Sequence, residues 1–195
     1  MKINLILLAA GSSSRFGENK LLHKIDGKPM YQRVTEVLND LPEGIFSKKI
    51  MVAQHEPILM DSTLYDHYTV VKNSDSSRGI SSSIHVGMAY SEEDVDAWCF
   101  MVCDQPYLTK DTILELVRNW IKSGQPLACV SNQNVLGNPT IFSNIFLDEL
   151  LELHGDKGGK AILERHMQEV YCYHVENKKE LADVDHPFDL TENNG

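Results

Sequence analysis

Residues 5–20 constrain the fold of this chain more than any other stretch. The apolar run LILLAA (residues 5–10) leads directly into GSSS (residues 11–14), and Arg15 and Lys20 follow. A continuous apolar run of this length is typical of a strand buried on both faces of a parallel sheet. The small residues after it let backbone N–H groups converge on one point, which is how loops bind phosphates. The stretch therefore predicts a strand followed by a triphosphate-binding loop.

Two well-known phosphate-binding loops do not fit this stretch. A Walker A loop needs serine or threonine directly after its lysine, but Leu21 follows Lys20, and Gly17 is followed by Glu18. The dinucleotide fingerprint Gly-x-Gly-x-x-Gly also fails, because three serines follow Gly11. An ordinary flexible loop with solvated basic residues is the alternative interpretation.

Length and charge limit the class of protein. The chain has 195 residues, 42% of them hydrophobic, which suits one folded domain over residues 1–195. Its formal net charge of −10 argues against a general nucleic-acid binder, which needs a basic face. The N-terminus lacks the features of a signal peptide, and no apolar run is long enough to span a membrane. We therefore expect a cytoplasmic protein with neither nucleic acid nor membrane as a partner.

The cysteines and histidines do not suggest a metal site. Cys99, Cys103, Cys129 and Cys172 include no Cys-x-x-Cys pair, and three of them lie in apolar, strand-like runs. We expect buried, reduced thiols in preference to a metal or disulfide role. The eight histidines are scattered without the spacing of metal ligands.

Strand-like and helical patterns alternate along the rest of the chain. Buried strands are predicted at 49–53, 68–71, 97–102 and 127–130, an extended run after a turn at 137–142, and a late edge strand at 170–175. An antiparallel orientation is left open for that last strand. Helices are predicted over 30–41, within 54–66, over 80–89, from 109 or 111 to 124, over 146–153 and from 160 onward. Such alternation is typical of a mostly parallel α/β sheet.

Asp104 stands just beyond the apolar run 97–102. Ligands of open α/β sheets gather at the carboxyl ends of strands. A carboxylate there, close to a phosphate loop, is well placed to hold Mg²⁺. The alternative is that Asp104 only begins a turn ahead of Pro106.

A second serine-rich stretch, residues 73–83, opens the helix predicted over 80–89. A helix start rich in N–H and hydroxyl donors suits an anion or the edge of a base. The serines could equally be the caps of an ordinary helix.

Together these segments resemble the MobA-like nucleotidyltransferases. Leu-Ala-Ala-Gly at 8–11, with Arg15 and Lys20 after it, is similar to the family's nucleotide loop, with Phe16 in place of the usual methionine. Cys-Asp-Gln-Pro at 103–106 is similar to its metal-binding turn. The Leu-Ala-Ala-Gly form is most similar to the branch that makes molybdopterin cytosine dinucleotide. The guanylyl branch more often has Leu-Ala-Gly-Gly.

Further similarities follow in the family's order through residue 190. Residues 73–83 resemble its nucleotide-recognition motif, with Gly79 and either Ser82 or Ser83 in matching places, and with Ser77 near the place of an aromatic residue in many members. Residues 137–142 resemble a stretch along the family's substrate cleft. Residues 155–160 resemble Gly-Asp-x-Gly-Ala-Arg of the cytidylyl members, with glycine and lysine in the last two places. Residues 181–190 resemble the late acidic motif of the family.

The resemblance implies a fold and an activity. The fold is a single-domain, three-layer α/β/α sandwich of the Rossmann-like nucleotidyltransferase type, with a mostly parallel sheet. The activity is transfer of CMP from CTP to the phosphate of molybdenum-bound molybdopterin, with Mg²⁺ as cofactor and pyrophosphate as product. A molybdenum hydroxylase would receive the dinucleotide. Three alternatives stay open: GTP-dependent guanylyl transfer, transfer to a sugar or alditol phosphate, and a non-catalytic protein that binds and delivers nucleotide or cofactor.

The resemblance also implies site residues. The catalytic residues would be Arg15, Lys20 and Asp104, and the metal ligands Asp104 and Asp185, while Asp183 faces away or acts indirectly. Nucleotide contacts are expected at Leu8, Ala9, Ala10, Gly11, Ser12, Ser13, Arg15, Lys20, Ser74, Gly79 and Ser82. Acceptor contacts are expected at Gln105, Pro106, Asn138, Pro139, Gly155, Asp156, Gly158 and Lys160.

Overall fold

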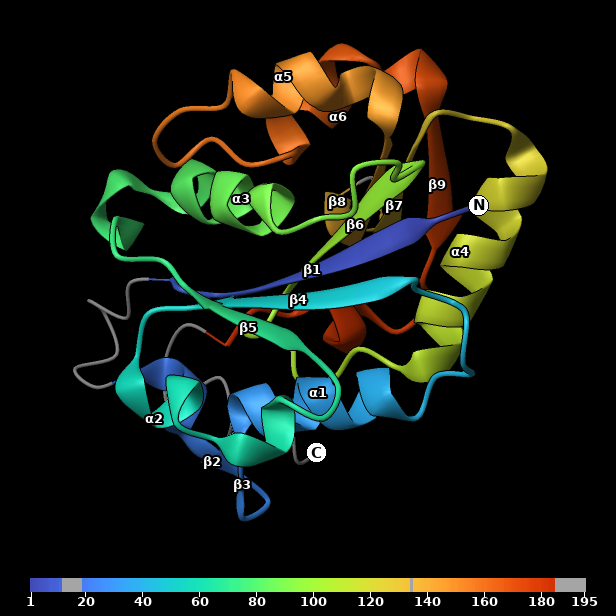
Figure 1. The fold of residues 1–195 in the computed structure, drawn as a ribbon. Helices are drawn as coiled ribbons and strands as arrows, with labels where there is room; N and C mark the ends of the chain where they lie inside the picture. The colour runs from blue at the N-terminus through green and yellow to red at the C-terminus, as the bar shows by residue number, and fades with distance from the viewer. Residues whose placement is uncertain (12–18, 134, 185–195) are drawn as a thin grey trace.

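A seven-stranded sheet organises the protein in the computed structural model, which describes residues 1–11, 19–133 and 135–184 (Figure 1). The strand order is β5-β4-β1-β6-β8-β7-β9. The bounds are β1 (Ile3–Ala9), β4 (Lys48–Ala53), β5 (Thr69–Lys72), β6 (Ala97–Val102), β7 (Leu127–Asn132), β8 (Val135–Ser143) and β9 (Val170–His174). A small separate hairpin pairs β2 (Lys24–Ile25) with β3 (Lys28–Pro29).

The large sheet is parallel except for β8, which runs antiparallel to both neighbours, β6 and β7. The predicted mostly parallel sheet is therefore confirmed. The antiparallel option for residues 170–175 is wrong, because β9 pairs in parallel with β7. Phe142 at the end of β8 and Val170 at the start of β9 both pair with Leu127. The chain thus leaves the sheet and re-enters it at the same end of the strands. Strand β9 therefore runs in the opposite direction to β8 and in the same direction as β7.

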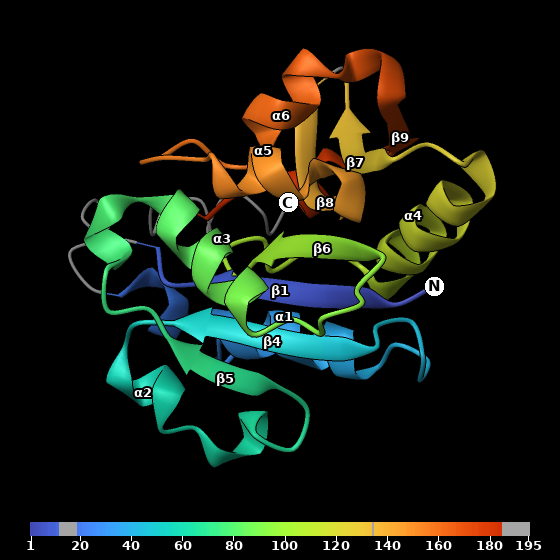
Figure 2. The ribbon, with the colours of Figure 1, turned by 45° about the horizontal axis from the view of Figure 1, so that its top comes forward.

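Helices cover both faces of the sheet, which confirms the three predicted layers (Figures 1 and 2). One face packs against α1 and α4, and the other against α3, α5 and α6. Their bounds are α1 (Met30–Asn39), α2 (Glu56–Leu59), α3 (Ile80–Ala89), α4 (Lys110–Ser123), α5 (Leu147–Leu151) and α6 (Lys160–Arg165). Short 3-10 helices are η1 (Lys20–Leu22), η2 (Ser62–Leu64), η3 (Ser76–Arg78), η4 (Asn144–Phe146), η5 (Met167–Glu169) and η6 (Lys178–Leu181).

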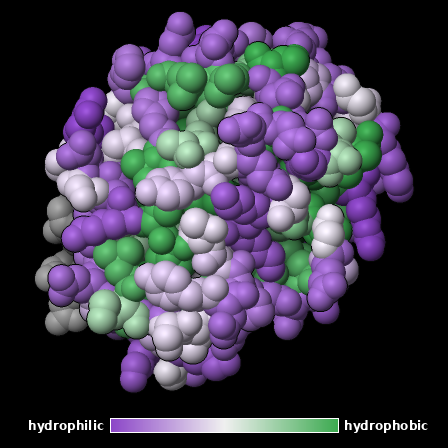
Figure 3. Space-filling model, viewed as in Figure 1, coloured by the Kyte–Doolittle hydropathy of each residue, from purple (hydrophilic) through white to green (hydrophobic). Residues whose placement is uncertain are grey.

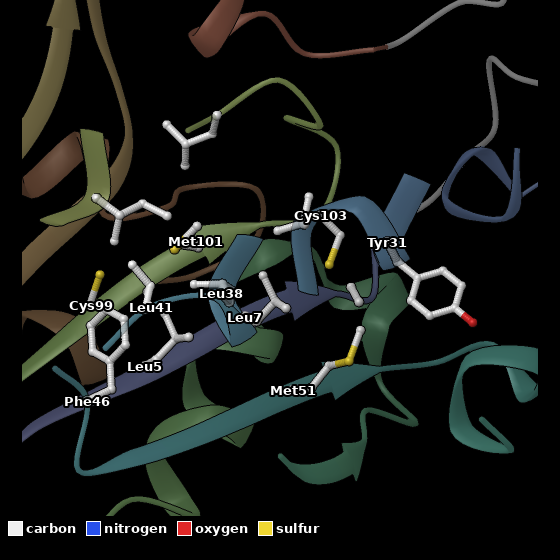
Figure 4. Close-up of a cluster of buried hydrophobic side chains, with 14 of the residues drawn as sticks. Leu5, Leu7, Tyr31, Leu38, Leu41, Phe46, Met51, Cys99, Met101 and Cys103 are labelled. Carbon is white, nitrogen blue, oxygen red and sulfur yellow. The ribbon is translucent and has the colours of Figure 1, made fainter. Parts of the chain in front are cut away.

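Strand β1 lies inside the sheet between β4 and β6, and all seven of its residues are buried. Its side chains alternate between the two faces, as the period of a strand requires. Leu5 and Leu7 join the cluster beneath α1 and α4, which Figure 4 shows in close-up. Ile6 and Leu8 join the cluster beneath α3, α5 and α6. Strand β1 therefore contributes to both hydrophobic layers, as the neighbouring β4 and β6 do, and its carboxyl end leads into the predicted phosphate loop.

The surface seen in Figure 3 is largely hydrophilic, with apolar side chains gathered over α5 at the top. Ile145, Leu147 and Leu151 are exposed in this region. Within the part of the chain that the structure describes, no helix has the length and apolar character needed to cross a membrane.

Candidate functional site

A cavity of about 460 Å³ opens at the carboxyl ends of β1 and β6. These strands are neighbours in parallel register, so the residues that follow them meet at one edge of the sheet. We name this space the central cavity. It is lined by Leu8, Ala10, Gly11, Lys20, Leu21, Ser76, Ser77, Gly79, Ile80, Ser83, Val102, Cys103, Asp104 and Asp156.

Lys20 and Asp104 form an ion pair in the central cavity. The Lys20 ammonium donates to Oδ2 of Asp104 at 2.8 Å, and the two side chains are 12% and 24% exposed. Asn19 positions the lysine, because its Oδ1 accepts from the Leu21 N–H and so caps η1. Two residues 84 positions apart in the sequence are thus brought together. The predicted roles, phosphate binding by Lys20 and metal binding by Asp104, require this proximity.

Asp104 also has the chemistry of a divalent-metal ligand. Its Oδ1 is buried and has no hydrogen-bond partner among the described residues, although Oδ2 is paired. No group of three or more His, Cys, Asp or Glu in the described part could hold a metal. Mg²⁺ nevertheless takes only one or two protein carboxylates beside substrate oxygens and water, so a single aspartate in this position fits. Asp185 lies outside the described residues.

Cys103 stands beside Asp104, but its thiol is unsuited to covalent chemistry. Burial, together with the charge of Asp104, raises the pKa of this thiol well above its ordinary value. The side chain is 1% exposed and packs in the hydrophobic core. A protonated, enclosed thiol is a poor nucleophile.

Gln54 holds the entrance of the loop after β1, and sequence reasoning missed it. Its Nε2 donates to the carbonyl oxygens of Ala10 and Gly11 at 3.0 and 3.1 Å. Its Oε1 accepts from the hydroxyl of Ser76. Gln54 directly follows β4 at the same edge of the sheet, as Asp104 closely follows β6, and that position was the available signal.

The serine-rich stretch 73–83 reaches the central cavity through Ser83, the second of the two serines that match the family motif, and not through Ser74 or Ser82. Ser83, Ser76 and Ser77 line the cavity, together with the predicted Gly79. Ser82 instead faces away: its hydroxyl donates to the Gly79 carbonyl and accepts from the buried Asn73 amide. The spacing of three from Ile80 to Ser83, which places both on one face of α3, could have identified Ser83.

Ser74 and Ser82 line a different space, the α3 cavity, of about 450 Å³. Gly155 also lies there, and its carbonyl oxygen accepts from the Ser81 N–H at 3.1 Å. Gly79 has φ +92°, and a Cβ at that position would lie 2.3 Å from the carbonyl carbon of Gly155. Only glycine permits this approach, which forms a wall between the α3 cavity and the central cavity.

Four of the eight predicted acceptor residues come together in a third space, the β8 cavity, of about 230 Å³. It contains the predicted Asn138, Asp156, Gly158 and Lys160. It is lined by Ile80, Leu136, Gly137, Asn138, Thr140, Asp156, Gly158, Gly159, Lys160 and Leu163. Ile80 and Asp156 line the central cavity as well, so the two spaces are adjacent.

Three other predicted acceptor residues do not line this space. Pro139 follows Asn138 through a cis peptide bond and is not part of the lining. Gln105 and Pro106 are buried. Gln105 donates from Nε2 to Asp183 Oδ1 at 2.9 Å, and the Val184 N–H donates to the Asp104 carbonyl at 3.0 Å. The turn at residues 103–106 is therefore held by the late acidic segment.

The remaining predicted nucleotide residues divide into three groups. Leu8, Ala10, Gly11 and Lys20 line the central cavity, whereas the side chain of Ala9 lies in the core beneath α1 and α4. Ser12, Ser13 and Arg15 lie outside the described residues.

Known proteins resemble this chain in sequence. A probable molybdenum cofactor guanylyltransferase of Bacillus subtilis is 26% identical over 135 residues, 69% of this chain and 64% of that protein. The bifunctional protein GlmU of Desulfitobacterium hafniense is 26% identical over 181 residues, 90% of this chain and 39% of that protein. The chain therefore spans less than two thirds of the length of these two curated relatives.

Solved structures share the fold. The crystal structure of Rv0371c from Mycobacterium tuberculosis superposes with a TM-score of 0.83 and 23% identity, covering 98% of this chain and 97% of that one. A manganese complex of Rv0371c gives a TM-score of 0.71 and 21% identity, with coverage of 98% and 97%. The fold is that of the α/β nucleotidyltransferases, as predicted. The MobA-like NTP transferase domain matches residues 5–170, and the chain belongs to this family.

Proposed function

We propose that this nucleotidyltransferase transfers CMP from CTP to the phosphate of a molybdopterin-type acceptor. The observation that carries the proposal is the contiguity of two cavities. The central cavity holds Lys20 and Asp104, the β8 cavity holds Lys160, and Ile80 and Asp156 line both. A triphosphate in the first and a phosphate monoester in the second would meet at this shared wall.

The chemistry needs no side-chain nucleophile. An oxygen of the acceptor phosphate attacks the α-phosphorus of the nucleotide, a new P–O–P bond forms, and the bond to the β-phosphate oxygen breaks as pyrophosphate leaves. The acceptor phosphate is already ionised, so no general base is required. Catalysis is then positioning and charge stabilisation.

The residues of the chain divide this work. Lys20, with Arg15, would bind the β- and γ-phosphates, and Lys160 would bind the acceptor phosphate. Gln54 holds the carbonyl groups of Ala10 and Gly11 and so fixes the entrance of the phosphate loop. Asp104, with Asp185, would hold a divalent cation, which when bound neutralises phosphate charge and aligns the reacting groups. The manganese complex of Rv0371c supports a divalent metal in a protein of this fold.

CTP is favoured as the donor by two stretches of sequence. Leu-Ala-Ala-Gly at 8–11 and the stretch 155–160 are most similar to the cytidylyl branch. GTP is the second candidate, because a relative from Bacillus subtilis is named a probable molybdenum cofactor guanylyltransferase.

Pyrophosphate release tests the proposal. The purified protein is incubated with Mg²⁺, molybdenum-bound molybdopterin and either CTP, GTP or ATP, with Asp104→Asn as the inactive control. We expect the largest kcat/KM with CTP. A larger value with GTP would replace CTP by the second candidate. Turnover only when a sugar or alditol phosphate is the acceptor would overturn the molybdopterin assignment. Nucleotide binding without pyrophosphate release would indicate a delivery protein.

The metal ligands have a test of their own. We expect Asp104→Asn and Asp185→Asn to abolish transfer at any Mg²⁺ concentration, because each removes a carboxylate charge from the metal. Asp183→Asn should retain much of the activity, because Asp183 accepts a hydrogen bond from the Gln105 amide, and asparagine can preserve it with its own oxygen. A fully active Asp185→Asn enzyme would contradict the assignment.

A further inference from the structure

Two cysteines face one another across the edge of the sheet. Cys129 of β7 and Cys172 of β9 are register partners, and their sulfur atoms are 3.9 Å apart. Register partners on adjacent strands lie about 4.8 Å apart. This separation falls within the Cα separations of about 4.4–6.8 Å that disulfides span. The spacing of the two strands is therefore compatible with a disulfide between these residues.

The two thiols differ in access to solvent. Cys129 is completely buried, and burial raises the pKa of its thiol. Cys172 is exposed on the outermost strand, contrary to the expectation that the cysteines are buried. Cys99 and Cys103 are buried and belong to β6 and the turn after it, which β8 separates from β7. A solute can thus reach Cys172, and Cys129 is its neighbour within the protein.

The pair is also connected to the β8 cavity. Cys129 pairs on its other side with Thr140 of β8, and Thr140 lines that cavity. The register between β7 and β8 shifts between Cys129 and Val130. A row of three paired residues, Cys172, Cys129 and Thr140, therefore runs across three adjacent strands from the exposed Cys172 to the wall of the β8 cavity. The pairing of β7 with β8 is irregular at this point.

We propose that Cys129 and Cys172 are a reversible oxidation site that forms a disulfide under mild oxidation of the folded protein. With hydrogen peroxide, the Cys172 sulfur is oxidised to a sulfenic acid and one water is released. The Cys129 thiol then attacks the sulfenic sulfur, the hydroxyl leaves with the thiol proton as a second water, and the S–S bond forms. Unlike the Cys103 thiol, Cys129 is held 3.9 Å from its reaction partner, and this proximity offsets the weak nucleophilicity of a buried thiol. Two thiols are oxidised and one peroxide is reduced, and a dithiol reductant restores both thiols.

Thiol counting and mass spectrometry test the site without any enzyme assay. We expect the native protein to lose two of its four thiols after peroxide treatment and about 2 Da of mass, with one cross-linked peptide pair containing Cys129 and Cys172. Dithiothreitol should reverse both changes. The cross-link closes a long loop, so the oxidised protein should melt about 5 °C or more above the reduced one.

Single variants make the test specific. Cys172→Ser changes an exposed residue and should fold, but it should form no internal cross-link. Cys99→Ser is the matched control and should cross-link as the wild type does. Retention of all four thiols by the wild type, or an internal disulfide in Cys172→Ser, would overturn the proposal.

An effect on catalysis rests on the proposed function and is measured separately. Because the row ends at Thr140, oxidation should change KM for the phosphate acceptor and leave KM for the nucleotide unaltered. A cross-link that forms without changing either KM would overturn this coupling and leave the oxidation site established. Loss of the proposed activity would not affect the thiol count.

Discussion

At the scale of single residues, the pairing of Lys20 with Asp104 implies competition between the lysine and a metal. The ammonium group occupies Oδ2 at 2.8 Å, so a cation that binds the whole carboxylate must displace it. The same lysine would then be available to the triphosphate. Removing its charge should therefore have opposite effects on metal and on nucleotide.

We predict that Lys20→Met increases the affinity for Mn²⁺ about fivefold in the absence of nucleotide. This factor corresponds to the ~1 kcal/mol of a partly exposed ion pair. The same variant should bind CTP more weakly and react more slowly, because a preorganised charge is lost. Electron paramagnetic resonance of free Mn²⁺ measures the first effect, and Lys72→Met, in the α3 cavity, is the control. Weaker Mn²⁺ binding by Lys20→Met would contradict the competition.

Single residues are also where the sequence is least informative. The position of Asp104 after a buried run was readable, because parallel strands direct their carboxyl ends to one edge. The choice of Ser83 over Ser82 needed one further step: Ser83 lies three residues after Ile80 and shares its face of α3, whereas the Asn73 amide bonds to both hydroxyls and does not distinguish them. Gln54 was missed because its role is to bridge two loops that are distant in sequence.

At the scale of elements, the late segment around η6 supports both α4 and the turn at residues 103–106, which contains Asp104. The buried Glu180 carboxylate accepts from the Thr109 N–H and from the hydroxyls of Thr109 and Thr112 at the start of α4. A negative charge is favourable at a helix N-terminus. Four residues further on, the Val184 N–H bonds to Asp104.

We predict that Glu180→Ala lowers the free energy of unfolding by about 2 kcal/mol, because it leaves three donors at the start of α4 without their acceptor. Glu176→Ala, at an exposed position on the same segment, should change it by less than about 0.5 kcal/mol. Urea denaturation measures both values. Equal losses in the two variants would show that Glu180 contributes no more than a surface residue.

The contact of α3 with the 155–156 loop depends on Gly79, which has no side chain. Gly79 has φ +92°, and a Cβ there would meet Gly155 at 2.3 Å and the Asp156 nitrogen at 2.7 Å. We predict that Gly79→Ala costs roughly 3 kcal/mol or more, because backbone strain and a steric clash add. Gly124→Ala is the control, since it has φ +68° but open space, and should cost about 1 kcal/mol. Similar unfolding free energies for both variants would exclude the clash.

Element types could largely be predicted from periodicity, but strand direction could not. The strands β1, β4 and β6 can be predicted from their apolar runs, because strands covered on both faces are continuously apolar. The direction of β9 depends on the edge at which the chain re-enters the sheet. The β7–β8 hairpin and the helices after it determine at which end of the strands the chain re-enters the sheet. Residues 170–175 themselves carry no information about these elements.

At the scale of the whole molecule, one sheet connects the two hydrophobic layers. In β1, Leu5 and Leu7 pack on one side and Ile6 and Leu8 on the other, and the side chains of β4 and β6 alternate in the same way. Neither layer can lose its packing without exposing a face of this shared sheet. The chain should therefore unfold as one cooperative unit, in keeping with the expectation of a single domain.

The two tryptophans test this expectation, because each reports on one layer. Trp98 lies in the layer with α3, α5 and α6, and Trp120 in the layer with α1 and α4; both are buried. Trp98→Phe and Trp120→Phe each leave one tryptophan. In either variant, we predict that fluorescence and far-ultraviolet circular dichroism give the same urea midpoint, although the midpoints of the two variants can differ. A fluorescence transition that precedes the loss of secondary structure in one variant would show that its layer unfolds separately.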